Sequence, residues 1–117
     1  MIEPSEVFKN IYPEGAARPH AVDWKVEPSL PYFNGHFPGT PILPAIAIVD
    51  ASTYILQRAL DQADLRLKAV VVAKFLSPIQ PGQAVHIALE KQSENEWQIE
   101  WKEQSDKKLL ATLRVQL

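Results

Sequence analysis

The sequence predicts an α+β protein in which an antiparallel sheet wraps one long central helix. Residues 44–60 contain no internal proline or glycine, and the first half of this segment is apolar on nearly every side, as in a helix that is buried. Four strand-like segments follow the helix, and short polar turns connect them. Because short turns join antiparallel neighbours, we expect one antiparallel sheet. The 117 residues suit a single domain over 1–117.

The N-terminal part of the chain alternates between short elements and loops. Residues 4–11 are expected to form a short helix, with Ser5 as its N-cap. Residues 20–26 alternate between polar and apolar, which predicts a strand with one dry face. Residues 28–44 hold five prolines and two glycines, so we expect a structured loop without regular elements. Pro44 suits the first turn of the long helix, where a missing N–H costs nothing.

The C-terminal part of the sequence is predicted to form strands throughout. Residues 67–76 are apolar enough for a central strand, while 84–90, 97–101 and 109–117 alternate at period two. A helix that is apolar on all sides must be covered on all sides, and a sheet covers only one of them. We therefore expect a second copy of the chain to cover the rest of the helix, as a dimer.

The composition excludes several classes of function. The chain has no cysteine, so disulfides, thiolate zinc sites and a cysteine nucleophile are excluded. The net charge is −2 and the basic residues are scattered, which argues against nucleic-acid binding. The N-terminus does not resemble a signal peptide, and the longest apolar run, 42–49, is too short to span a membrane, so a cytoplasmic protein is expected.

Cofactor and metal sites are not expected either. The three histidines are separated by 16 and 50 residues, which matches no compact metal-ligand pattern. The chain contains no G-x-S-x-G elbow and no glycine-rich phosphate loop. The sequence therefore predicts no metal site, no nucleotide-binding site and no serine hydrolase activity.

The candidate chemistry lies in a histidine and an aspartate. Asp50 is placed inside the most apolar helix, where burial would raise its pKa and let it donate a proton near neutral pH. Alternatively, it faces a solvent gap or bonds a local backbone group. His36 lies in the proline-fixed loop ahead of that helix, and imidazole titrates near neutral pH. His20 and His86 fall in strand patterns, so surface or packing roles are expected for both.

The start of the helix adds a third group. The first amides of a helix have no internal acceptor, and the helix dipole is positive there. The Ala45 amide, just after Pro44, could therefore polarise a carbonyl oxygen. A base, an acid and an oxyanion donor together suit removal of a proton beside a carbonyl, with a neighbouring hydroxyl leaving as water.

Two stretches resemble the 3-hydroxyacyl-[acyl-carrier-protein] dehydratases. Residues 35–51, GHFPGTPILPAIAIVDA, are similar to the family signature G-H-F-P-G-x-P-x-x-P-G and its acid-bearing helix. Residues 74–82, KFLSPIQPG, are similar to the F-x-x-P-x-x-P-G strand end. The resemblance covers essentially the whole chain. It implies a hotdog fold that assembles as a homodimer or as a trimer of dimers.

The resemblance also implies roles for individual residues. His36 would be the catalytic histidine, Asp50 the catalytic acid, and the Ala45 amide the group that holds the thioester carbonyl. In the family, the histidine and the acid of one site come from different subunits. The chain departs from the family in having alanine instead of glycine at position 45, and in carrying Asp50 where the shorter branch usually has glutamate.

The implied reaction converts a 3-hydroxyacyl thioester, carried by the phosphopantetheine arm of an acyl carrier protein, into a trans-2-enoyl thioester. Candidates to line the acyl tunnel are Phe33, Phe37, Ile46 and Tyr54, of which the two phenylalanines could equally be core. Candidates to meet the carrier protein are the basic residues Arg66, Lys68 and Lys74. The alternatives are a hotdog thioesterase, in which Asp50 activates water, and a non-catalytic acyl-binding or scaffold subunit.

Overall fold

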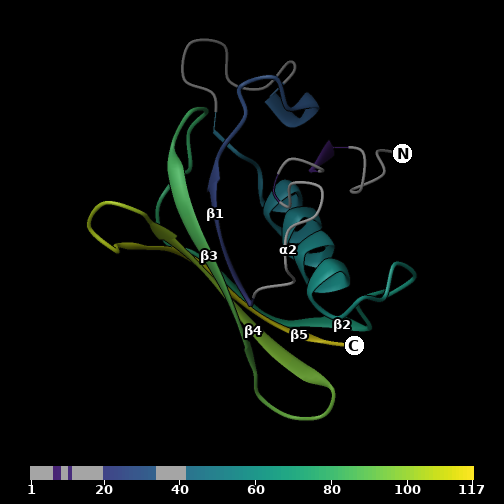
Figure 1. Cartoon of the computed structure of the whole chain (residues 1–117). Coiled ribbons are helices and arrows are strands. Elements are labelled where there is room, and N and C mark those ends of the chain that lie inside the picture. The colour runs from purple at the N-terminus through teal and green to yellow at the C-terminus, as the bar shows by residue number, and fades with distance from the viewer. Residues whose placement is uncertain (1–6, 9–10, 12–19, 34–41) are drawn as a thin grey trace.

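The computed structural model describes residues 7, 8, 11, 20–33 and 42–117. In this part of the chain, five antiparallel strands form one curved sheet and a long helix packs against its concave face (Figure 1). The helix is α2 (Ala45–Ala59), and a short 3-10 helix, η1 (Pro31–Phe33), precedes it. The strands are β1 (Ala21–Lys25), β2 (Ala69–Phe75), β3 (Ala84–Lys91), β4 (Glu96–Glu103) and β5 (Leu109–Gln116), in the sheet order β1-β3-β4-β5-β2.

Strands β3, β4 and β5 form the centre of the sheet, and their alternation at period two is confirmed. Ile87 of β3 pairs with Trp101 of β4, and Ile99 of β4 pairs with Leu113 of β5. All four side chains are buried on the face that α2 covers. The alternate positions carry polar and charged residues on the outer face, as expected for an antiparallel sheet with one solvated side.

Helix α2 begins and ends as its sequence suggests. Pro44 is the N-cap, in an extended conformation just outside the first turn, and its carbonyl accepts the first helical bond from the Ala47 amide at 3.0 Å. Leu60 is the C-cap, and Asp61 then takes a positive φ of 55° that turns the chain away from the helix.

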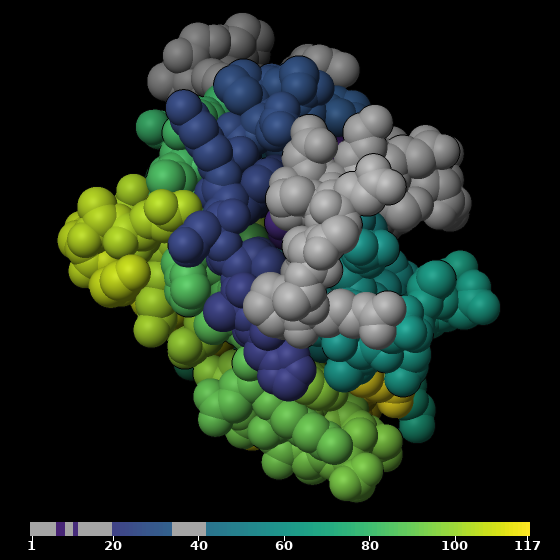
Figure 2. Space-filling model, in the orientation of Figure 1, coloured from purple at the N-terminus to yellow at the C-terminus, as the bar shows by residue number. Residues whose placement is uncertain are grey.

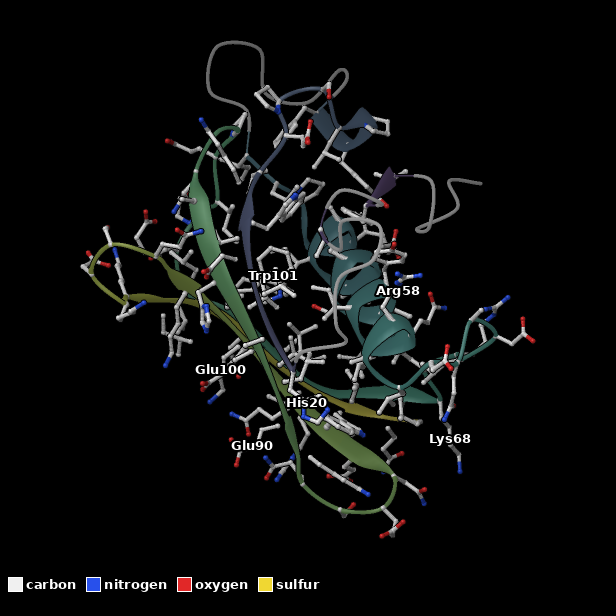
Figure 3. All side chains as sticks on the ribbon, in the orientation of Figure 1. His20, Arg58, Lys68, Glu90, Glu100 and Trp101 are labelled. Carbon is white, nitrogen blue, oxygen red and sulfur yellow. The ribbon has the colours of Figure 1, made fainter. Side chains whose placement is uncertain are left out.

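Small side chains lie on the face of α2 that packs against the sheet. Ala47, Ala51 and Ser52 are buried where the helix packs on the strands. The Ser52 hydroxyl accepts a hydrogen bond of 3.0 Å from the indole Nε1 of Trp101 on β4. Figure 3 shows Trp101 between the sheet and α2. This bond links α2 to the buried face of β4.

Aromatic rings connect the N-terminal residues to this core. Phe8 stacks on Tyr32 of η1 with a centroid separation of 5.8 Å, and its ring meets Trp24 of β1 edge-on at 5.8 Å. Trp24 in turn meets Trp101 edge-on at 6.1 Å. Figure 2 shows η1 and β1 forming one continuous stretch of the molecular surface. The segment that carries η1 is thereby held against the sheet.

Three expectations from the sequence need correction or limits. The segment 67–76 was expected to form a central strand, but β2 lies at the edge of the sheet with most of its side chains exposed. Its apolar residues on both faces therefore have little cover from the part of the chain that the structure describes. The loop 28–44 contains the short helix η1, which Pro31 starts with its fixed φ. The helix expected at 4–11 lies mostly outside the described residues, whereas the strand expected at 20–26 is confirmed as β1.

Among the described residues, no helix combines the length and the apolar content needed to cross a lipid bilayer.

The bond between helix and sheet can be tested by removing its acceptor. Replacing Ser52 with alanine leaves the buried indole N–H of Trp101 without a partner, so the free energy of unfolding should fall by about 1–3 kcal/mol. Urea unfolding of Ser52→Ala measures this loss. The control is Ser105→Ala, in the exposed turn between β4 and β5, which should change stability by less than about 0.5 kcal/mol. Equal losses in both variants would contradict the importance of the buried bond.

Candidate active site

Asp50 and Tyr32 form a hydrogen-bonded pair between α2 and η1. The Tyr32 hydroxyl donates to Oδ2 of Asp50 at 2.6 Å. The Tyr32 side chain is buried, and Asp50 is half-buried. Burial, and then the hydrogen bond and the charge of the Asp50 carboxylate, raise the pKa of Tyr32 above its usual value. The phenol therefore remains protonated and keeps its role as donor.

Both partners are placed by local structure. The Phe33 amide donates a hydrogen bond of 3.1 Å to the Leu30 carbonyl, which closes the single turn of η1. In this turn the Tyr32 side chain reaches Asp50 on α2. Asp50 sits in the second turn of α2, after the apolar start of the helix. The sequence predicts a buried carboxyl group with His36 as its partner. In the structure Asp50 is half-buried and its partner is Tyr32, while His36 lies outside the described residues.

One face of α2 leads from solvent into the core past Asp50. Ile46, Asp50 and Tyr54 follow each other at intervals of four residues, so their side chains share this face. Ile46 is 59% exposed, Asp50 is half-buried, and Tyr54 is only 6% exposed. The carboxyl group therefore stands at the border between solvent and the apolar interior.

The start of α2 presents backbone donors near this face. The first intrahelical hydrogen bond is donated by the Ala47 amide. The Ala45 amide comes before it in the chain and therefore has no acceptor within the helix. Ala45 is exposed. The N-terminal end of the helix dipole adds partial positive charge at this point. A developing negative charge on a carbonyl oxygen would be stabilised there.

The other candidates from the sequence fall into three groups. His36 and Phe37 lie outside the described residues. Phe33 is half-buried and packs against the core. The basic candidates are all exposed, and Figure 3 labels one of them, Lys68, just before β2; the three are Arg66, Lys68 and Lys74.

The remaining histidines lie away from α2. Nδ1 of His86 is 2.7 Å from Oδ1 of Asp23, its cross-strand partner on β1, and this pair is on the polar outer face of the sheet. His20 meets the ring of Trp97 edge-on at 5.5 Å. The surface role expected for His86 and the packing role open to His20 agree with these contacts. In the described part of the chain, no three His, Asp or Glu side chains come close enough to hold a metal ion.

Tyr32 is the residue of the site that sequence reasoning missed. It lies in the proline-rich stretch 28–44, where no periodic pattern shows which side chain faces the helix. Its partner Asp50 is 18 residues away in sequence. The one available signal was a polar aromatic residue shortly before the histidine motif.

Comparisons with known proteins show which family the chain belongs to. The profile of the ApeI-like family, described as ApeI dehydratase, matches residues 14–114. A 3-hydroxyacyl-[acyl-carrier-protein] dehydratase FabZ of Lactobacillus helveticus is 36% identical over 72 residues, covering 55% of this chain and 49% of that protein. The chain thus spans about half the length of the curated relatives it matches.

Two solved structures illustrate the shared fold. The dehydratase heterocomplex ApeI:P from Xenorhabdus doucetiae superposes with a TM-score of 0.72 at 22% identity, covering 88% of this chain and 90% of that chain. Slr0204, a 1,4-dihydroxy-2-naphthoyl-CoA thioesterase from Synechocystis, gives a TM-score of 0.54 at 15% identity, covering 82% and 77%. With one helix held against a five-stranded antiparallel sheet, the expected hotdog fold is confirmed.

Proposed function

Because the chain belongs to the ApeI-like dehydratase family, we propose that it removes water from a 3-hydroxyacyl thioester to give a trans-2-enoyl thioester. The observation that carries this proposal is the position of Asp50. Its carboxyl group is hydrogen-bonded, half-buried, and on the same helix whose first amides precede the first intrahelical hydrogen bond. A proton donor beside an oxyanion donor suits elimination of a β-hydroxyl next to a thioester carbonyl.

In this mechanism, His36 of one protomer removes the α-proton of the substrate. The Ala45 amide stabilises the negative charge that develops on the thioester oxygen. Asp50 of the partner subunit protonates the β-hydroxyl, which leaves as water while the double bond forms. An alanine at position 45 supplies the same backbone N–H as the glycine usual in the dehydratases, so the donor is retained.

The substrate would enter along the exposed start of α2. Its acyl chain would follow the face from Ile46 toward the buried Tyr54, with Phe33 and Phe37 as further lining. The thioester would arrive on the phosphopantetheine arm of an acidic carrier protein. The exposed Arg66, Lys68 and Lys74 are the basic groups proposed to meet it.

A second copy of the chain is proposed to pair along β2. Val70 and Phe75 of this edge strand pair with the buried Val115 and Ala111 of β5, so their side chains point to the face that α2 occupies. Both are nonetheless more than 40% exposed, because the helix does not reach them. On the opposite face, Val72 is 40% exposed.

An apolar strand edge with both faces uncovered invites pairing with another strand. Two identical antiparallel edges can satisfy each other around a two-fold axis. The resulting homodimer, alone or in a trimer of dimers, would extend the sheet through β2 and bring the second protomer's residues to the uncovered side of α2. The site can then draw its histidine and its acid from two protomers.

A thioesterase is the second candidate, because solved neighbours of the same fold include thioesterases such as Slr0204. In that reaction, Asp50 would activate water to attack the thioester carbonyl. The family match favours the dehydratase, and the products separate the two reactions.

The reaction can be tested with a 3-hydroxybutyryl thioester on acyl carrier protein, followed by mass spectrometry. Wild-type protein should yield the enoyl thioester, with a loss of one water. His36→Ala and Asp50→Asn should each lower kcat by roughly 100-fold or more, because each removes a proton-transfer group. The control, His86→Ala, changes a histidine on the outer face and should keep wild-type kcat.

Two results would contradict the proposal. Release of free acid and thiol would identify a thioesterase. Wild-type turnover no faster than that of His36→Ala would favour a non-catalytic acyl-binding or scaffold subunit.

The dimer can be tested by placing a charge on the β2 edge. Wild-type protein should sediment as two chains or a multiple of two. Val72→Asp should shift the mass toward single chains, because each copy would bring a charged carboxylate to the apolar strand edge that is proposed to pair. Analytical ultracentrifugation measures the mass. The control, Gln98→Asp on β4 inside the sheet, should leave the assembly unchanged. A wild-type protein that sediments as a single chain at assay concentration would contradict the proposed assembly.

A further inference from the structure

We propose that Tyr32 is a positioning residue for Asp50, and that its hydroxyl confines the transferable proton of Asp50 to the Oδ1 oxygen. This inference rests on the proposed dehydratase function. It is carried by the contact of 2.6 Å between the Tyr32 hydroxyl and Oδ2, and by the packing that fixes the tyrosine ring.

The ring of Tyr32 is held from the side of the sheet. Phe8 stacks on it with an interplanar angle of 18°, Trp24 meets Phe8, and Trp101 meets Trp24. Trp101 then bonds Ser52, which lies two residues after Asp50 on α2. This series of contacts runs from Tyr32 on η1 to Ser52 on α2, so the tyrosine ring is held relative to the helix that carries Asp50.

The hydrogen bond distinguishes the two oxygens of Asp50. A tyrosine hydroxyl has one proton to donate, and here it gives that proton to Oδ2. With Oδ2 acting as acceptor, the acidic proton of a neutral Asp50 belongs on Oδ1. The carboxyl group then presents a defined O–H to the substrate instead of rotating between two equivalent orientations.

The same bond strengthens during the reaction. As water leaves, the Oδ1–H bond breaks, its proton goes to the departing β-oxygen, and the Cβ–O bond breaks. The electrons of the Cα–H bond, whose proton goes to His36, form the new double bond. Asp50 becomes a carboxylate, and hydrogen bonds to a charged acceptor are stronger than those to a neutral one. The Tyr32 bond therefore favours the transition state over the ground state.

The test variant is Tyr32→Phe, which keeps the ring and its stacking on Phe8 but removes the hydroxyl. We expect kcat to fall roughly 10- to 100-fold, the range for losing one hydrogen bond to a charged group, while KM changes by less than about twofold. The control for a merely structural effect is Ile99→Val, which opens a small gap in the buried centre of the sheet. It should lower the melting temperature and retain wild-type kcat.

Tyr32→Phe protein with wild-type kcat, or with a loss no larger than that of Ile99→Val, overturns the inference. A second measurement is independent of activity: crystal structures of wild-type and Tyr32→Phe protein should show the Asp50 carboxyl group turned to a different rotamer in the variant. An unmoved carboxyl group overturns the inference. If wild-type protein releases free acid, the proposed dehydratase function fails by itself, and the two crystal structures still decide whether Tyr32 positions Asp50.

Discussion

The fit of α2 against the curved sheet is the constraint on which the rest of the structure depends. Ala47, Ala51 and Ser52 are buried in α2, and the hydroxyl of Ser52 accepts a hydrogen bond from Trp101 of β4. Tyrosine and tryptophan apart, Ser52 is the one buried polar side chain in the described part of the chain. A single directional bond in an apolar core specifies one packing arrangement, whereas apolar contacts alone tolerate several.

This fit determines where the chemistry can occur. With the helix in place, its exposed start offers backbone amides, and its next turns lead into the core through Ile46, Asp50 and Tyr54. Asp50 therefore stands at the border between solvent and the apolar interior, which is where we propose that the thioester binds. η1 is anchored to the same frame through Phe8, so Tyr32 reaches Asp50 from a fixed position.

Sequence reasoning predicted the elements whose patterns are local. Period two in β4 and β5, and the unbroken apolar run of α2, predict their structures because alternation and helical periodicity follow directly from burial on one side. The same reasoning misplaced β2, because a strand that is apolar on both faces reads as central whether its cover comes from its own chain or from another. Tyr32 was missed because its contact depends on the path of an irregular segment.

The central claim is that the acid and the base of one site come from two protomers. Tyr32 contacts Asp50 within one chain and lies four residues before His36. Four extended residues reach roughly 13 Å. Chain connectivity therefore permits a site whose histidine and acid come from one chain as well as a site shared by two. Co-expression of His36→Ala and Asp50→Asn chains carrying different tags tests the claim most directly. If the chains pair at random in a two-fold dimer, shared sites should restore about a quarter of wild-type activity. Mixed dimers as inactive as either parent would place both groups in one chain and contradict the account.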